Sequence, residues 1–224
     1  MTDPTPTDPP AEAATAVSAE RLSQVLVARL CHDLMSPASG IVSGLDFLGD
    51  TSGEDLRAEA MNLIASSARK LMDLLTFYRV ALGGFAEGAD FDARQLEILA
   101  QGVFAHVRPE LDWAVDAPTL SGTAARVLLN LVHIAAGAIA MGGVAHVSVR
   151  REAGWLALIV QADGARARLQ PEVVAGLKGE PPGDGLPGRW VQAYCLHGQV
   201  AAAGGGLAAE PGDSGILFKA VIPT

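Results

Sequence analysis

Two long helical stripes separated by one short break constrain this chain more than any other feature of its sequence. From residue 18 to about residue 48, apolar side chains recur at helical spacing and share one face. The acidic, glycine-containing stretch 49–53 ends the pattern, and a second stripe follows. The stripes consist of Leu22, Leu26, Leu30, Leu34, Ile41, Leu45 and Leu48, then Leu56, Ala60, Leu63, Ser67, Leu71, Leu74 and Tyr78. Residues 18–83 are therefore predicted to form an antiparallel two-helix hairpin.

A hairpin of two helices cannot enclose a hydrophobic core by itself. Pairing two copies would give a four-helix bundle and bury both stripes, so we expect a homodimer. The alternative is that the rest of the chain covers the stripes instead.

Composition excludes several classes of protein. Hydrophobic residues make up 50% of the 224 residues and charged residues 18%, which predicts a folded chain. The net charge of −9 argues against a nucleic-acid partner, because nothing concentrates cations against phosphates. The two cysteines, Cys31 and Cys195, form no CxxC pattern, so we expect no disulfide framework and no metal site.

Two segments are candidates for a targeting or membrane segment, and neither pattern favours one. Residues 1–17 are rich in Asp, Thr, Pro and Ala without a basic start or apolar run, so they are predicted to be a disordered segment rather than a signal peptide. The apolar stretch 128–147 contains Asn130, His133 and several glycines, which favours a buried helix and a turn over a membrane span. We expect a cytoplasmic protein without membrane contact.

His32 is the candidate catalytic residue. It lies on the first predicted helix, roughly opposite the centre of the leucine stripe, and so should face solvent. Pro37 follows five residues later, inside the helical pattern, where proline costs about 3 kcal/mol. A neutral imidazole is a good nucleophile toward phosphorus, and Asp33 would hold its tautomer or accept its proton. The alternative is an ordinary surface histidine.

The remaining chain, residues 84–224, is predicted to be a second domain. Helical patterns occupy residues 92–104, a stretch after 121 and a stretch after 186, and strand patterns occupy 111–115, 145–151, 155–162 and a last segment from 216. Mixed strands with segregated helices indicate an α/β two-layer sandwich, and the whole chain an α+β fold.

The segment His32–Pro37 resembles the H-[ED]-x-x-[TSN]-P motif of the dimerisation and phosphotransfer hairpin of sensor histidine kinases. Later segments are similar, in the same order, to motifs of the ATP-binding domain of those kinases. They are Asn130–Ala135, the stretch from Gly183 to Gly198, and Gly215–Pro223.

The departures from the kinase pattern fall on the residues that would hold ATP. Ile134 stands where the kinases have a metal-coordinating asparagine, and Ala162 where they have an adenine-binding aspartate. Arg166 replaces a glycine of the same motif, although a shift by one residue would place Asp163 at the aspartate position. We therefore expect a degenerate ATPase-like domain that binds neither ATP nor another cofactor.

This combination resembles the ChpT family of histidine phosphotransferases. The resemblance implies a homodimer that shuttles a phosphoryl group through His32 between the receiver domain of a CckA-like hybrid histidine kinase and CtrA-like or CpdR-like response regulators. Mg²⁺ is then expected on the partner receiver domain. Two alternatives stay open: an active histidine autokinase, and a non-catalytic dimeric docking protein.

A receiver domain that reaches His32 should contact the hairpin around and beyond that residue. Arg166 and Arg168 would add a second contact, because receiver domains are acidic around their phosphorylation pocket. The predicted partner-binding residues are Met35, Ser36, Ser39, Val42, Asp46, Asn62, Ser66, Arg69, Arg166 and Arg168.

Overall fold

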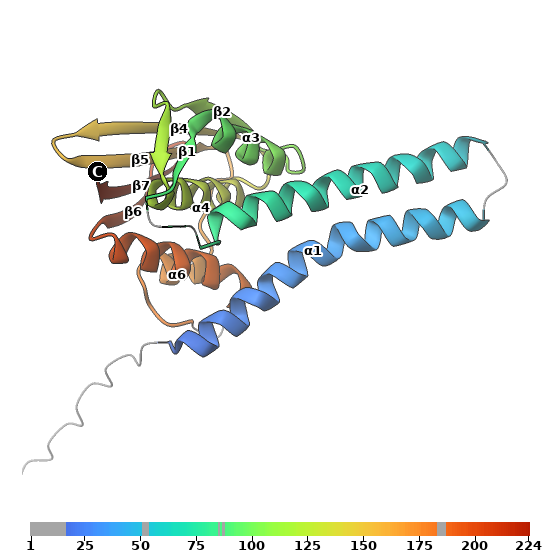
Figure 1. The fold of residues 1–224 in the computed structure, drawn as a ribbon, viewed down its shortest axis with the longest axis horizontal. Helices are drawn as coiled ribbons and strands as arrows, with labels where there is room; N and C mark the ends of the chain where they lie inside the picture. The colour runs from blue at the N-terminus through green and yellow to red at the C-terminus, as the bar shows by residue number, and fades with distance from the viewer. Residues whose placement is uncertain (1–16, 51–53, 85, 87, 183–186) are drawn as a thin grey trace, which may run out of the picture.

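A computed structural model describes residues 17–50, 54–84, 86, 88–182 and 187–224. The predicted N-terminal disordered segment therefore lies, except for Val17, outside the described residues. The chain begins with two long antiparallel helices, α1 (Ala19–Asp50) and α2 (Glu54–Ala81), which project from a mixed α/β unit (Figure 1). The predicted hairpin is confirmed.

Small residues bring the two helices of the hairpin close together. A Cβ atom built on Gly40 would lie 2.4 Å from the Ser67 hydroxyl oxygen, and one on Gly44 would lie 2.6 Å from Cγ1 of Ile64. Pro37 is buried inside α1, where it leaves the carbonyl of Asp33 without the usual helical N–H donor. Figure 1 shows that α1 is bent.

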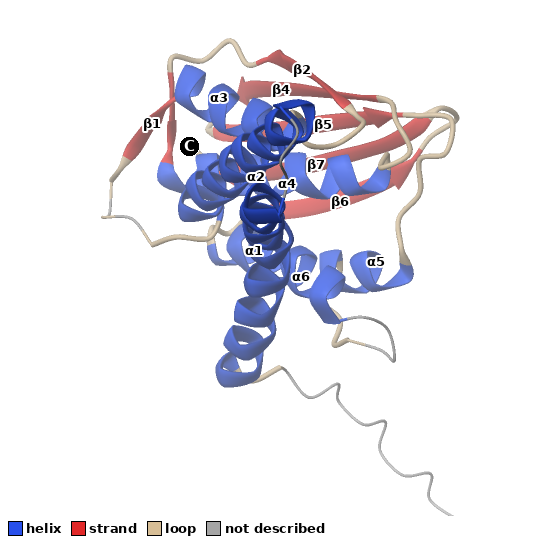
Figure 2. Cartoon of the chain, turned by 90° about the vertical axis from the view of Figure 1, so that its right-hand side faces the viewer, coloured by secondary structure: helices blue, strands red, loops and turns tan. Residues whose placement is uncertain are grey.

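The α/β unit is built on a five-stranded sheet with strand order β2-β4-β5-β7-β6, in which only β2 and β4 are parallel. Helices cover one face, and the other is more exposed, so the unit has two layers (Figure 2). A two-stranded sheet, β1-β3, lies beside it. The elements are β1 (Asp90–Asp92), α3 (Ala93–Phe104), β2 (Glu110–Ala114), β3 (Thr119–Ser121), α4 (Gly122–Ala138), β4 (Val144–Glu152), β5 (Trp155–Asp163), α5 (Pro171–Leu177), α6 (Pro187–Ala202), β6 (Gly206–Pro211) and β7 (Gly215–Pro223).

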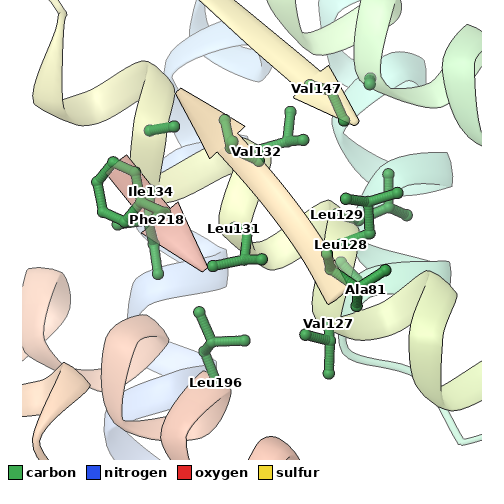
Figure 3. Close-up of a cluster of buried hydrophobic side chains, with 14 of the residues drawn as sticks. Ala81, Val127, Leu128, Leu129, Leu131, Val132, Ile134, Val147, Leu196 and Phe218 are labelled. Atoms are coloured by element: carbon green, nitrogen blue, oxygen red, sulfur yellow. The ribbon is translucent and has the colours of Figure 1, made fainter. Parts of the chain in front are cut away.

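Helix α4 lies at the centre of the core. Its leucines and valines pack between Phe218 of β7, Leu196 of α6 and Ala81 at the end of α2 (Figure 3). The base of the hairpin therefore shares one hydrophobic core with the α/β unit. The predicted boundary between residues 83 and 84 falls directly after α2, but no separation of the cores accompanies it.

Two further contacts fix the hairpin to the α/β unit. Val25 of α1 packs against the buried Trp190 and Val191 of α6. The buried Asn130 side chain of α4 donates a hydrogen bond of 2.7 Å to the Ala81 carbonyl, near the C-terminus of α2. Because an unpaired buried amide is costly, this bond ties the end of the hairpin to the sheet-covering helix.

The apolar stripes of the hairpin have two different environments. Near the base of the hairpin, Leu22, Leu26 and Leu74 pack against the α/β unit. In this half of the hairpin the stripes are therefore covered by the rest of the chain, which is the alternative to covering by a second copy. Toward the tip, Leu45 and Leu56 have exposed fractions of 55% and 53%. This half lacks a cover among the described residues.

Among the described residues, one helical stretch, Ala19–Gly49, is long and apolar enough to cross a membrane by length and composition alone. These criteria are weak evidence, because core helices of soluble proteins and signal sequences also meet them. Here the stretch packs against α2 and, near its start, against α6.

The close approach at Gly44 predicts a large effect from a single methyl group. In Gly44→Ala the new Cβ would meet both Ile64 and the Ala60 carbonyl, at 2.6 and 3.1 Å, so we expect a loss of about 1–3 kcal/mol in the free energy of unfolding. Gly49→Ala is the matched control, since its Cβ meets nothing within 4 Å and alanine favours a helix. Urea unfolding measures both, and equal stability of the two variants would contradict the packing described.

Candidate functional site

His32 is presented to solvent by the middle of α1. Its side chain is 81% exposed, as predicted from its position opposite the leucine stripe. The Nδ1 atom lies 3.2 Å from Oδ1 of Asp33. Because an ionised carboxylate only accepts hydrogen bonds, Nδ1 is the nitrogen that carries hydrogen, and the lone pair of Nε2 is left available.

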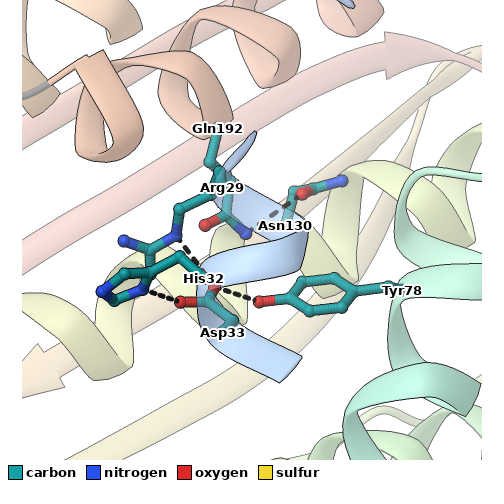
Figure 4. A network of polar contacts seen from close by, with 6 residues as sticks. All are labelled: Arg29, His32, Asp33, Tyr78, Asn130 and Gln192. Atoms are coloured by element: carbon teal, nitrogen blue, oxygen red, sulfur yellow. Dashed lines mark hydrogen bonds and ion pairs between the residues drawn. The ribbon is translucent and has the colours of Figure 1, made fainter. Parts of the chain in front are cut away.

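Asp33 is held in place by a hydrogen bond and an ion pair. Its side chain is 14% exposed; its Oδ2 atom accepts a hydrogen bond of 2.7 Å from the Tyr78 hydroxyl and lies 2.8 Å from Nε of Arg29 in an ion pair (Figure 4). Arg29 precedes Asp33 by one helical turn, whereas Tyr78 reaches across from α2. The carboxylate thus has a fixed orientation, and it in turn fixes the imidazole ring.

The network continues into the α/β unit through stacked rings. The ring of His133 on α4 stacks on Tyr78 with centroids 5.8 Å apart, and its centroid lies 5.4 Å from that of Phe77. Burial, and then the hydrogen bond to Asp33, raises the pKa of Tyr78, so the phenol keeps the hydrogen that it donates. Burial, and then the charge of Arg29, lowers the pKa of His133 to about 4.

The predicted partner-binding residues are all exposed. On α1 they follow His32 at helical spacing toward the tip of the hairpin, and on α2 they lie beside that part of α1, where Ser67 meets Gly40. None of these facts shows a partner, so the assignment stays a prediction. The exposed members on the hairpin are Met35, Ser36, Ser39, Val42, Asp46, Asn62, Ser66 and Arg69.

Arg166 and Arg168 lie elsewhere, in the loop that follows β5. They line a cavity of about 380 Å³ together with Arg29 and Arg189. Arg29 and Arg189 also line a neighbouring cavity of about 510 Å³ at which His32 lies. The structure thus brings the second predicted contact region next to the histidine, with Arg29 between the two.

The positions that correspond to the ATP-binding residues of kinases carry no usable oxygen ligand. The Ile134 side chain is buried in α4, and Ala162 is buried in β5. Asp163 is not a substitute, because its Oδ1 atom accepts hydrogen bonds from Gln161 and Ser214 and its alternation in β5 places it on the sheet face away from the helices. Among the described residues, no group of three or more His, Cys, Asp or Glu is placed to hold a metal ion.

Sequence reasoning missed three members of the site. The sequence places Tyr78 only in the apolar stripe, because the partner of its hydroxyl, Asp33, lies 45 residues away. Arg29 carried a usable signal, since an arginine four residues before an aspartate on a helix forms an ion pair. Arg189 had no signal, because its neighbours in space come from other elements.

An exposed histidine on a two-helix hairpin that packs against a mixed α/β unit is the arrangement expected of a histidine phosphotransfer protein. The family model described as "Histidine phosphotransferase C-terminal domain" matches residues 93–215, which is more than half of the chain. The chain belongs to this family, the ChpT-like histidine phosphotransferases.

Two relatives cover nearly the whole chain. The protein phosphotransferase ChpT of Brucella abortus (strain 2308) is 28% identical over 205 residues, which span 91% of this chain and 97% of that protein. A solved structure of a bacterial phosphotransferase superposes with a TM-score of 0.81 at 28% identity, covering 92% of this chain and 98% of the other. The catalytic domain of histidine kinase ThkA reaches a TM-score of 0.49 at 17% identity, a likeness that carries no argument about activity.

The lowered pKa of His133 predicts a pH dependence of stability. Between its ordinary pKa of 6.5 and the folded value of about 4, the unfolded chain takes up a proton at His133 that the folded chain does not. The free energy of unfolding therefore falls as the pH drops through this window. His133→Phe keeps a ring against Tyr78 and should lose less stability over the window, by about 3 kcal/mol at most.

Urea unfolding of the wild-type chain and of His133→Phe at several pH values between 4 and 6.5 measures this difference. Carboxylates that titrate in the same range are present in both proteins, so their contribution cancels when the two are compared. An identical pH dependence of the two proteins would show that His133 is not held neutral in the folded state.

Proposed function

We propose that this chain shuttles a phosphoryl group through His32 between the receiver domain of a hybrid histidine kinase and response regulators, without using ATP. The observation that carries the proposal is the exposed Nε2 side of His32, whose other nitrogen is held by the anchored carboxylate of Asp33. CckA-like kinases and CtrA-like or CpdR-like regulators are the proposed partners, in a cytoplasmic phosphorelay, by likeness to the ChpT family.

The transfer step follows from the fixed tautomer. The lone pair of Nε2 attacks phosphorus of an aspartyl phosphate, the phosphorus–nitrogen bond forms, and the phosphorus–oxygen bond to the aspartate breaks. The imidazole then carries positive charge, which the Asp33 carboxylate stabilises while the hydrogen stays on Nδ1. Mg²⁺ bound by the receiver would neutralise the phosphoryl oxygens, and the reverse reaction passes the group to the next receiver.

The absence of ATP use is supported by the side chains at the corresponding positions. A buried isoleucine and a buried alanine supply neither a metal ligand nor an acceptor for adenine, and Asp163 is directed to the other face of the sheet. An ATP-dependent kinase needs both contacts.

The hairpin and the arginines after β5 are the proposed docking surface for the receiver. The α1 residues beyond His32 and the α2 residues assigned to this surface are all exposed. Arg166 and Arg168 add positive charge beyond the base of the hairpin, complementary to an acidic phosphorylation pocket.

A homodimer is the second part of the proposal. Several apolar residues near the hairpin tip, such as Leu45, Leu56 and Met61, are more than half exposed, and an exposed apolar surface on two adjacent helices is typical of an interface. A second hairpin would complete a four-helix bundle.

The phosphotransfer assay distinguishes the proposal from its alternatives. The purified chain is incubated with radiolabelled ATP alone, and then with a panel of labelled receiver domains. We expect label from a receiver only, with complete loss in His32→Ala. His146→Ala is the matched control, because His146 is also exposed and its Nδ1 atom lies 2.7 Å from Asp112.

Labelling from ATP alone would contradict the ATP-free part of the proposal and indicate an autokinase. Receivers that bind the wild-type chain without labelling it would indicate a docking protein. If labelling were also lost in His146→Ala, the loss in His32→Ala would no longer identify His32 as the phosphorylated residue.

Light scattering tests the dimer. The wild-type chain should have twice the mass of 23.1 kDa, and Leu45→Glu should reduce it to a monomer because a carboxylate would be buried in the bundle. Ile98→Glu is the control, since Ile98 is 61% exposed on α3, away from the hairpin tip. A monomeric wild-type chain, or monomers from both variants, would contradict this interface.

A further inference from the structure

The cavity between α1, α4, α6 and the loop after β5 has an unusual charge for this protein. Four of the 16 lysines and arginines line it, namely Arg29, Arg166, Arg168 and Arg189, although the chain as a whole has a net charge of −9. Among the described residues, no aspartate or glutamate lines the cavity. The cavity therefore concentrates positive potential inside an acidic protein.

Three of these arginines lack an internal counter-ion. Within the described part of the chain, Arg166, Arg168 and Arg189 form no ion pair, and Arg29 uses only its Nε atom, on Asp33. Arg189 lies in the first turn of α6, where the helix dipole adds partial positive charge. These three side chains are exposed, so solvent screens much of their mutual repulsion, and a bound anion would supply the counter-ion that they lack.

One residue that lines the cavity also carries a buried polar atom without a partner. The Nδ1 atom of His133 is buried and has no hydrogen-bond partner among the described residues, although His133 lines the cavity. Such a group is destabilising unless a ligand or water satisfies it.

We propose that this cavity, formed by Arg29, Arg166, Arg168, Arg189 and His133, binds a small molecule through its phosphate groups. Guanidinium groups match phosphate oxygens with paired hydrogen bonds, and several of them surrounding one cavity favour a ligand with two or more phosphates. The cavity of about 380 Å³ lies within the size range of small-molecule sites. Because Ala162 is buried where kinases bind adenine, the phosphates rather than a base provide the recognition.

Occupancy of the cavity has a consequence for His32. Arg29 contributes Nε to Asp33 and also lines the cavity, so a phosphate bound by its terminal nitrogens would share the positive charge that now pairs with Asp33 alone. The ligand would also cover Arg166 and Arg168, which are proposed to dock the receiver. A bound ligand therefore inhibits phosphoryl transfer. This inhibition rests on the proposed function, whereas the binding itself does not.

Calorimetric titration of the full chain with inorganic pyrophosphate tests the site, with inorganic phosphate and ADP titrated in parallel. We expect saturable binding of pyrophosphate, weaker binding of phosphate, and no more than a few-fold difference between pyrophosphate and ADP. The double variant Arg166→Ala/Arg168→Ala should bind pyrophosphate at least tenfold more weakly. The matched control is Arg150→Ala/Arg151→Ala, which removes two exposed arginines from β4 and should bind as the wild-type chain does.

Several outcomes would overturn the proposal. They are no binding at millimolar pyrophosphate, undiminished binding by the Arg166/Arg168 variant, and an equal loss in the Arg150/Arg151 control, which would indicate a general charge effect. Binding of ADP more than tenfold tighter than pyrophosphate would assign the cavity to a nucleotide base instead. The titration measures binding to the chain alone, so its result decides the proposed site independently of whether the chain transfers phosphoryl groups.

Discussion

The carboxylate of Asp33 is the interaction on which the site depends. It accepts hydrogen bonds from the ring of the neighbouring His32 and from Tyr78 on the second helix, and it forms an ion pair with Arg29 one helical turn before it. These three partners come from both helices of the hairpin, so the imidazole is oriented by the packing of the hairpin and not by α1 alone. His32 thereby has one defined nucleophilic nitrogen, Nε2, although its side chain faces solvent and is open to a partner.

The α/β unit supports this arrangement instead of supplying a nucleotide. Asn130, which belongs to the motif that resembles the kinase helix, hydrogen-bonds the end of α2, and His133 of the same motif stacks on Tyr78. Trp190 at the start of α6 packs on the first helix. Residues of motifs that resemble those for ATP thus hold the base of the hairpin. The arginine-lined cavity lies in the same region and shares Arg29 with the Asp33 network.

The sequence predicted those features that depend on local patterns. Helical periodicity identified the hairpin, and the solvent-facing direction of His32 and its pairing with Asp33 followed from position along one helix. Contacts between segments that are distant in sequence could not be predicted. Examples are the hydrogen bond from Tyr78 to Asp33 and the arginines from three segments that line one cavity. The short helix α5 and the strand β6 were also missed, because seven residues carry little periodicity and the glycines before β6 favoured only a turn.

The most direct test of the account is the position of the phosphoryl group on the phosphorylated chain, determined by nitrogen-15 and phosphorus-31 magnetic resonance after transfer from a receiver domain. Because Asp33 occupies Nδ1, the account predicts one phosphohistidine, at His32, with phosphorus bonded to Nε2. A phosphoryl group on Nδ1, on another histidine or on a carboxylate would contradict it.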